Sequence, residues 1–444
     1  MILENRRMKG KVIDQKHLIP FILITSLFAL WGFANDITNP MVAAFRTIME
    51  IPNSEAALIQ FAFYGGYGTM AIPAALFVRK YSYKKGILLG LALYATGAFL
   101  FIPAARFETF SFFLLSLYIL TFGLAFLETT ANPYIISMGD EATSTRRLNF
   151  AQSFNPLGSL LGMFVASNYV LTSLDSERRD AAGNLLFPTL SEAEKAVIRT
   201  HDLAIIRNPY VIIGGVVLLM FVIIALVRMP VTQTAERSSI RAADAAKRLL
   251  KNRNYREGVI AQFFYVAAQI MCWTFIIQYA ENINIPKAAA QRYNILAMLL
   301  FLSSRFISTY LMKYLKPSRM LALFAVGAIA TTLGIIFIGG MTGLYCLVAT
   351  SVFMSLMFPT IYGIALKGLG DDATLGAAGL VMAIVGGALM PPLQGAIIDL
   401  GNIGWLPAVN ASFILPFICF VMVLTYGLRT SQLDSVNQKQ HYPT

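Results

Sequence analysis

The sequence predicts an all-α membrane protein with twelve transmembrane helices, and three observations lead to this fold class. Hydrophobic residues make up 57% of the 444 residues and charged residues only 13%, whereas a soluble globular protein has about a quarter charged residues. The mean hydropathy is +0.64. Long apolar runs recur along the whole chain, which is long enough for about a dozen spans of roughly 20 residues each.

Twelve apolar runs with few charges are candidates for these helices. A linker at 229–257 separates the first six runs from the last six, so the chain is expected to divide into the halves 1–228 and 258–444. The expected bounds of the runs are about 18–42, 57–78, 86–104, 110–137, 148–172, 209–228, 258–280, 292–312, 320–340, 342–366, 375–398 and 404–428.

The composition excludes a secreted disulfide scaffold, a nucleic-acid-binding domain and a disordered chain. The cysteines lie in apolar runs without CxxC spacing and are expected to be core residues. The histidines lie outside the runs, and no phosphate-binding glycine loop or serine nucleophile motif occurs. We therefore expect no enzyme activity, no metal and no cofactor. The residues concerned are Cys272, Cys346, Cys419, His17, His201 and His441.

The basic residues predict the orientation, because membrane insertion leaves Lys and Arg mainly on the cytoplasmic side. With the N-terminus inside, 25 of them fall on the cytoplasmic side and nine on the other. This predicts that both termini and the linker 229–257 are cytoplasmic, in a bacterial inner membrane. The loop 173–208 is then outside, where Ser191 and Glu194 form a capping-box pair that predicts a short surface helix. In the linker, Glu236–Leu250 is expected to be an amphipathic helix at the membrane surface.

The two halves repeat each other in sequence. GDEAT at 139–143, after the fourth run, recurs as GDDAT at 370–374, after the tenth. Lys80-Tyr81 recurs as Lys313-Tyr314 at nearly the same offset. The shared offset predicts two pseudo-symmetric six-helix halves in parallel orientation, the layout of major facilitator transporters, whose substrate lies where the halves meet. The alternative explanation is that basic turns recur in any polytopic protein.

Three charged residues lie inside predicted spans, where each costs about 2.5–3.5 kcal/mol to insert. Glu128 precedes Asn132 by one helical turn, and a carboxyl group in an occluded setting can bind a proton from one side and release it to the other. Asp36 shares a helix face with Asn39. Both acids are candidates for proton coupling, and the alternative for each is a structural role. Arg305 either pairs with a carboxylate or extends to the cytoplasmic surface.

Amide and aromatic residues form polar stripes along other spans, with the helical spacing of one face. Amides and hydroxyls offer donors and acceptors without net charge, and aromatic rings offer a flat surface to C–H groups. These stripes favour a neutral polyhydroxylated ligand such as a sugar, although each one alone is also explained by hydrogen bonds between helices. The candidate substrate-binding residues are Asn39, Tyr64, Asn132, Gln152, Asn155, Gln262, Tyr265, Gln269 and Trp273; those with a gating or structural role are Arg305, Lys80, Lys84 and Lys313.

Several motifs resemble the fucose–galactose–hexose proton symporters of the major facilitator superfamily. The resemblance extends from about 19 to 428. It rests on Leu30-Trp31-Gly32, FAFYGGY at 61–67, LETTANPY at 127–134, LNFAQSFNP at 148–156, QFFYVAAQIMCW at 262–273, Arg305-Phe306 and FPT at 358–360.

The resemblance implies proton-coupled uptake of a monosaccharide, L-fucose or a related hexose, by alternating access. It also implies that Glu128 is the family's membrane glutamate and that Gln152 and Asn155 are its amides in the fifth span. The family's aspartate of the first span falls on Asn39, whereas this chain has its acid at Asp36. Asp36 either takes over that role or accompanies a changed sugar. The expected partners are a monosaccharide, the proton and the lipid bilayer, with no nucleic acid, and a monomer is expected to function. The alternatives within transport are an uncoupled sugar facilitator and a drug–proton antiporter.

The predicted orientation can be tested by labelling residue 180. A cysteine in place of Asp180 should react with a membrane-impermeant thiol reagent in intact spheroplasts, because the loop 173–208 is expected to face the periplasm. Protection in intact spheroplasts, followed by labelling only after lysis, would contradict this orientation.

Overall fold

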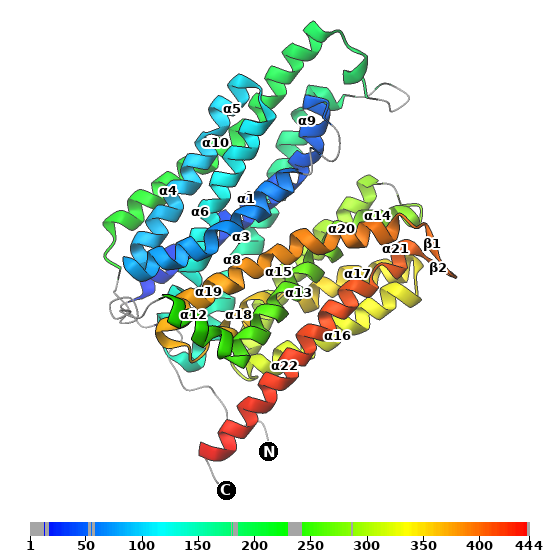
Figure 1. Ribbon diagram of the computed structural model, residues 1–444. Coiled ribbons are helices and arrows are strands. Elements are labelled where there is room, and N and C mark those ends of the chain that lie inside the picture. Colours follow the sequence, from blue (N-terminus) through cyan, green and yellow to red (C-terminus); the bar gives the residue numbers. More distant parts are fainter. Residues whose placement is uncertain are drawn as a thin grey trace. The chain divides into compact units, whose positions relative to one another are not determined.

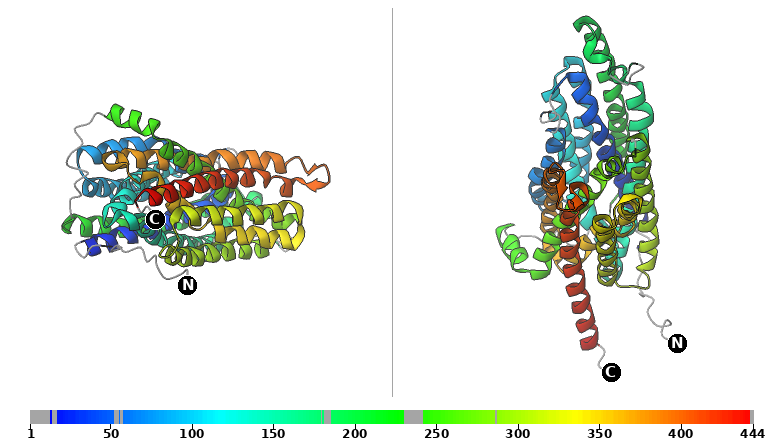
Figure 2. Two further views of the ribbon diagram at one scale, coloured as in Figure 1. Left: turned by 90° about the horizontal axis from the view of Figure 1, so that it is seen from below. Right: turned by 90° about the vertical axis from the view of Figure 1, so that its right-hand side faces the viewer.

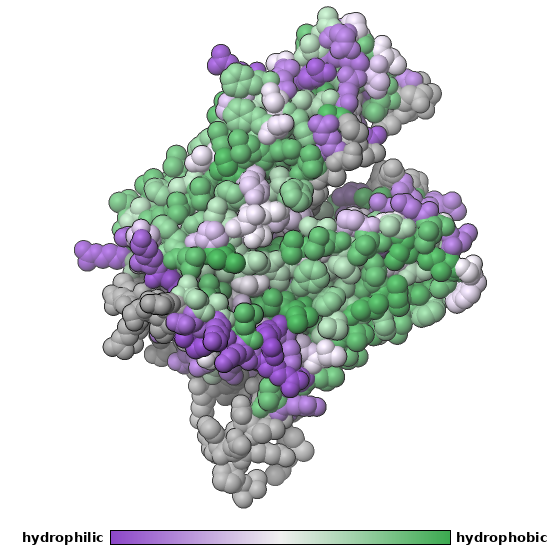
Figure 3. Space-filling view, viewed as in Figure 1, coloured by the Kyte–Doolittle hydropathy of each residue, from purple (hydrophilic) through white to green (hydrophobic). Residues whose placement is uncertain are grey.

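The computed structural model describes residues 13, 17–51, 55, 58–178, 180, 185–229, 242–285 and 287–441, and it is almost entirely helical (Figure 1). For residues 39, 40, 42, 43, 60, 287–289 and 434–441 the description covers the backbone alone. Hydrophobic side chains line the lengths of the helices, and hydrophilic ones gather at their ends (Figure 3). This distribution is expected for a chain whose apolar segments lie in hydrocarbon.

The chain packs into two compact units. One combines Ile22–Ala131 with Phe154–Val231; the other combines Met1–Phe21, Asn132–Ser153 and Thr232–Thr444. We call them the first-helix unit and the linker unit, after α1 and the linker helix α12. Because this grouping follows packing contacts and not the sequence repeat, the division into halves at 228 and 257 stays a prediction.

The first-helix unit contains nearly all of α1, the long helices α3, α4 and α10, and most of α6. Its elements are α1 (Leu18–Met49), α3 (Leu58–Lys80), α4 (Tyr83–Phe99), α5 (Phe101–Phe107), α6 (Phe110–Ser137, up to Ala131), α8 (Phe154–Val165), the π-helical segment η3 (Ala166–Val170), α9 (Leu171–Ser173), the short 3-10 turns η4 (Asp175–Glu177) and η5 (Phe187–Thr189), and α10 (Glu192–Leu226).

The linker unit contains the remaining helices and a two-stranded hairpin. Its elements are η2 (Glu141–Thr143), α7 (Ser144–Gln152), α12 (Ala242–Lys251), α13 (Arg253–Thr274), α14 (Ile276–Asn282), α15 (Lys287–Leu311), α16 (Pro317–Phe337), α17 (Gly340–Met354), α18 (Met357–Leu366), η6 (Gly370–Asp372), α19 (Ala373–Met382), η7 (Ala383–Val385), α20 (Gly386–Ile398), β1 (Asn402–Ile403), β2 (Leu406–Pro407), α21 (Ala408–Ala411) and α22 (Ile414–His441). The end of α22 extends past its neighbours in this unit (Figure 2).

Ten of the predicted spans appear as helices long and apolar enough to cross a membrane, and the bent pair α13–α14, with an angle of 43°, accounts for an eleventh. The remaining predicted span, 148–172, does not form one long helix. Ser153 interrupts it between α7 and α8, and residues 166–170 near its C-terminal end are π-helical. The number of continuous helices therefore understates the number of apolar segments that the sequence predicts.

Glycines bring α1 and α8 into backbone contact within the first-helix unit. A Cβ atom at Gly158 would lie 1.8 Å from the carbonyl oxygen of Ala29, and one at Gly32 would lie 2.0 Å from that of Asn155. Gly162 follows Gly158 by four residues and faces the carbonyl oxygen of Phe33. Small residues at this spacing allow close helix packing in membranes. Such packing matters there because no hydrophobic driving force brings helices together in lipid.

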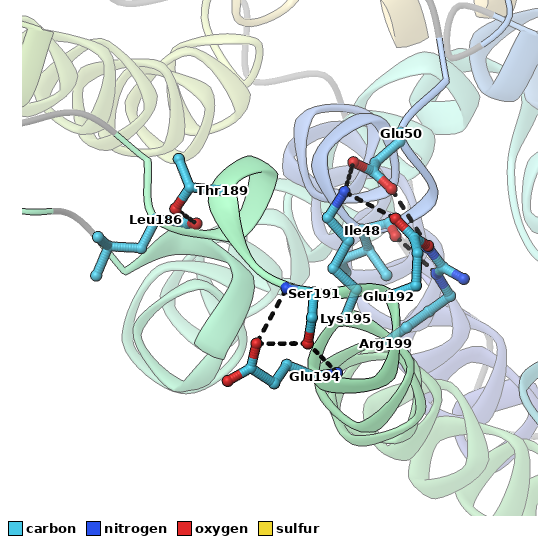
Figure 4. Close-up of polar contacts among 9 residues, drawn as sticks. All are labelled: Ile48, Glu50, Leu186, Thr189, Ser191, Glu192, Glu194, Lys195 and Arg199. Carbon is cyan, nitrogen blue, oxygen red and sulfur yellow. Dashed lines mark hydrogen bonds and ion pairs between the residues drawn. The ribbon is translucent and has the colours of Figure 1, made fainter.

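The predicted capping box at the start of α10 is confirmed. The Ser191 hydroxyl accepts a hydrogen bond from the backbone N–H of Glu194, whose carboxylate accepts one from the backbone N–H of Ser191 (Figure 4). The expected short surface helix is wrong, however. The helix continues without a break for 35 residues, from Glu192 to Leu226, and Pro209 lies inside it where the apolar run begins.

Two basic residues of α10 hold the end of α1 (Figure 4). Lys195 pairs with Glu50 at 2.7 Å, and Arg199 donates to the carbonyl oxygen of Ile48 at 3.1 Å. Glu50 has a left-handed backbone conformation with φ of 52°, so it ends the helix where these cations bind. The polar beginning of α10 thus fixes the end of the helix that carries Asp36.

The linker contains a helix, as predicted, at Ala242–Lys251. The predicted start at Glu236 lies outside the described residues. Arg248 of α12 forms two hydrogen bonds with Asp372, at 2.7 and 2.8 Å. This contact fastens α12 to the beginning of α19 within the linker unit.

The contact between α1 and α8 can be tested by adding one methyl group. Gly158→Ala should destabilise the protein by about 1–3 kcal/mol, because the new Cβ must push two backbones apart. Gly215→Ala is the matched control, since nothing lies within 4 Å of a Cβ there, and its helical glycine should gain up to about 1 kcal/mol. Thermal unfolding of the purified variants in detergent measures both; equal midpoints would contradict the close packing.

Candidate functional site

Both predicted proton-coupling acids are buried in the first-helix unit. Asp36 on α1 and Glu128 on α6 are each 8% exposed. Asp36 accepts a long hydrogen bond, 3.4 Å, from the side chain of the neighbouring Asn35. A carboxylate at this depth in an apolar helix is costly unless protonated or well partnered. The structure therefore places both acids where proton binding has a large energetic effect.

Two tyrosines of α3, Tyr64 and Tyr67, are buried in the same unit as these acids. The Tyr64 hydroxyl is within the electric field of Asp36, and the Tyr67 hydroxyl is within those of Glu128 and Tyr64. The tyrosines are one helical turn apart on α3 and are 7% and 6% exposed. Phenolic hydroxyls can both donate and accept hydrogen bonds. Asp36, Tyr64, Tyr67 and Glu128 thus form a buried polar group, called here the acid–tyrosine group.

A second group of predicted residues meets in the linker unit. The Gln152 side chain, at the end of α7, donates to the Asn132 side chain at 2.9 Å. The backbone carbonyl oxygen of the same Gln152 accepts a hydrogen bond from Arg305 at 3.0 Å. All three side chains are at least 95% buried. The predicted amide pair and the predicted arginine therefore belong to one contact network.

Aromatic residues extend this network from α15 to α13. The Arg305 guanidinium lies 4.5 Å from the ring centre of Phe301, whose ring packs edge-on against Trp273 with centres 5.0 Å apart. The indole N–H of Trp273 donates to the Ser351 hydroxyl at 3.1 Å. We call Asn132, Gln152, Arg305, Phe301 and Trp273 the amide–aromatic network.

The predicted stripe on α13 divides into partnered and unpartnered residues. The Tyr265 hydroxyl donates to the carbonyl oxygen of Met354 at 3.0 Å, so it joins α13 to α17, as the interhelical alternative requires. Gln262 is fully buried, and among the described residues neither its amide nitrogen nor its amide oxygen has a hydrogen-bond partner. Buried amides rarely lack partners, so Gln262 is the residue of this stripe with unused hydrogen-bonding capacity. Gln269 is half-buried.

Arg305 binds backbone carbonyl groups at two helix ends. It donates to the carbonyl oxygen of Ser355, directly after α17, at 2.5 Å, and to that of Gln152, the last residue of α7. Among the residues that the structure describes, it forms no ion pair with a carboxylate. Neither expectation from the sequence, a carboxylate partner or extension to the surface, describes this arginine, which is 3% exposed.

Most of the remaining predicted residues have other partners. The Asn155 side chain donates to the carbonyl oxygen of Phe28 at 3.3 Å, so it does not share a partner with Gln152. Lys84 donates to the carbonyl oxygens of Ala225 and Val227 and so caps the end of α10. Lys80 and Lys313 each lie over an adjacent tyrosine ring. Asn39 lies in α1, and its side chain is outside the described residues.

Sequence reasoning missed two buried contacts of the segment 132–153. Arg147, counted among the loop cations, is fully buried and donates to the carbonyl oxygens of Ile135 and Ile136 in the last turn of α6 and to that of Gly139 after it. The Asn149 side chain donates to the Thr360 hydroxyl of α18 at 3.1 Å. The FPT motif contained Thr360, but nothing in the sequence related it to Asn149.

Comparisons with known proteins agree with this architecture. The family model of the Major Facilitator Superfamily matches residues 22–385. An L-fucose-proton symporter of Haemophilus influenzae is 69% identical over 422 residues, which cover 95% of this chain and 99% of that protein. An L-fucose-proton symporter of Escherichia coli is 35% identical, with 94% of each chain covered. A crystal structure of the transporter FucP in its outward conformation superimposes with a TM-score of 0.85 at 34% identity and covers 94% of this chain and 99% of that one.

Proposed function

Because this chain belongs to the Major Facilitator Superfamily and is a multi-pass membrane transporter, not an enzyme, we propose that it imports a neutral monosaccharide together with protons. L-fucose is the first candidate, since this sugar appears in the names of the relatives that are 69% and 35% identical. The structural observation that carries the proposal is the buried Glu128, one helical turn before the Asn132 that binds Gln152. A proton-binding group and sugar-binding amides thus follow each other on one helix.

The amide–aromatic network is the proposed sugar-binding region, together with Gln262. Sugar hydroxyls can replace the hydrogen bond between Gln152 and Asn132 and can use the unpaired amide of Gln262. Trp273 offers a ring face for stacking against the sugar. Tyr64, Asn39, Asn155, Tyr265 and Gln269 are further candidates by their place in the sequence stripes.

Glu128 is the proposed proton carrier, and Asp36 is a second acid that tunes sugar recognition or proton access. Tyr64 interacts electrostatically with Asp36, and Tyr67 does so with Glu128. These tyrosines support a joint role of the two acids, because a hydroxyl can donate to a carboxylate and accept from a carboxylic acid. A carrier must be neutral when the site changes sides and must release its proton to the cytoplasm. Burial in an apolar helix favours that neutral form.

Arg305 is the proposed gating residue. Its two hydrogen bonds join the ends of α7 and α17, so a change in the angle between these helices must break at least one of them. Lys84 has a structural role as the cap of α10 in this proposal. Both termini lie on the cytoplasmic side of the inner membrane in this proposal. The protein functions as a monomer.

The proposed activity is tested by the pH of the medium. Cells that express the protein should alkalinise a weakly buffered medium when L-fucose is added, because protons enter with the sugar. A panel of hexoses and deoxyhexoses identifies the substrate. Sugar counterflow without alkalinisation would indicate a facilitator instead, and neither response to any sugar would contradict sugar transport.

Gln152→Ala should weaken sugar binding by about 1–3 kcal/mol, because the sugar's hydroxyl and Asn132 lose a buried partner. Asn410→Ala is the matched control: this buried amide donates to Tyr279 and to the carbonyl oxygen of Ile335 and has no proposed contact with sugar. Calorimetric titration of L-fucose into both purified variants measures the effect. Unchanged affinity in Gln152→Ala would remove Gln152 from the site.

Glu128→Gln should separate exchange from accumulation. The amide mimics a permanently protonated carboxyl group, so the variant should still bind sugar and exchange it across the membrane but should fail to concentrate it. One proton moving down 100 mV supplies about 2.3 kcal/mol, and this energy is lost. Counterflow and active uptake in the same vesicles test the assignment. If Glu128→Gln still accumulates sugar with protons while Asp36→Asn does not, the roles of the two acids are reversed.

A further inference from the structure

The linker helix α12 has two faces of different character. Ala245 and Leu249 are buried and point into the linker unit, where α12 packs against α13 and α19. On the other side Leu250 is 65% exposed, and Lys247 and Lys251, three residues before it and directly after it, are exposed as well. A single large apolar side chain between two lysines is typical of helices that lie in a membrane interface.

Acidic residues pair with some of the cations of this region and leave others without a carboxylate partner among the described residues. Asp372 binds Arg248, and Glu257 binds both Arg253 and Arg429. In the described part of the chain, no carboxylate pairs with Lys247, Lys251 or the exposed Arg256. Asp244 of α12 is exposed as well, so these three cations leave a net positive charge on the outward surface, and hydrophilic side chains gather over α12 (Figure 3).

The position of α12 next to a membrane-spanning helix limits what can reach this surface. Lys251 is separated from the first residue of α13, Arg253, by one residue. The apolar part of α13 begins near Val259, so α12 lies within a few residues of the hydrocarbon boundary. It lies at the side of the linker unit (Figure 2), so its exposed face is open to molecules at the membrane surface.

We propose that the outer face of α12 is a binding surface for anionic phospholipid headgroups of the inner leaflet. Lys247, Lys251 and Arg256 bind the headgroup phosphates, and Leu250 inserts between the acyl chains. Arg248 of α12 binds Asp372 at the start of α19, and α12 directly precedes α13. Lipid bound to α12 therefore stabilises the adjacent ends of α13 and α19. The proposal depends on α12 lying at a membrane surface and not on which sugar is carried.

The test uses the full-length protein in detergent with an equimolar mixture of phosphatidylglycerol and phosphatidylcholine of identical chains. Native mass spectrometry gives the ratio of the two lipids that stay bound. The protein should retain phosphatidylglycerol preferentially, and K247Q/K251Q should lower this preference about 10- to 30-fold, the effect of removing two cations from an anionic surface. K247R/K251R should retain it, because the charge is unchanged.

The matched control is R106Q/R292Q, which removes two exposed cations from elsewhere on the protein and should leave the preference unchanged. An equal loss in this control would show that net charge alone attracts the lipid and would overturn the proposal. An unchanged preference in K247Q/K251Q, with thermal unfolding like that of the unsubstituted protein, would overturn it as well. Because binding is measured without sugar, failure here is distinguishable from failure of the proposed transport function.

Discussion

Cations bound to the carbonyl ends of helices hold much of this protein together. The last carbonyl groups of a helix have no partner within it and carry partial negative charge. Arg147 binds those of α6, Arg305 those of α7 and α17, and Lys84 those of α10. In hydrocarbon, where every backbone polar group needs a partner, each such contact satisfies carbonyl groups and a buried or half-buried cation together.

The interrupted helices make this arrangement possible. A continuous helix would use the carbonyl oxygens of Gln152 and Ser355 for its own hydrogen bonds, and Arg305 would then be an uncompensated charge. The interruptions at Ser153 and Ser355 release these groups within apolar segments. The same interruption ends α7 where the Gln152 side chain reaches Asn132, so one local feature creates both the arginine contact and the amide pair.

The sequence was sufficient for the architecture because an apolar run in a membrane has almost no choice except to form a helix. It was also sufficient for the capping box of Ser191 and Glu194, which depends on residues three apart. It was not sufficient for Arg305 or Arg147. Their partners are backbone carbonyl groups, which every residue possesses, so no side-chain type marks them. Ser153 and Ser355 likewise carry no breaking signal, because the arginine that compensates the break at Ser153 is more than 150 residues away.

The unbroken helix α10 has a practical consequence for imaging. Its 35 residues give a length of about 52 Å at 1.5 Å per residue, whereas the hydrocarbon core of a bilayer is about 30 Å thick. Roughly two-fifths of the helix therefore projects as a rod, whose N-terminal end is held to the end of α1 by the ion pair of Lys195 with Glu50. A small membrane protein has little mass outside the detergent belt for particle alignment in electron microscopy. A rod of this kind is a natural place to attach a rigid fusion partner or raise a nanobody, because its orientation follows that of the spans.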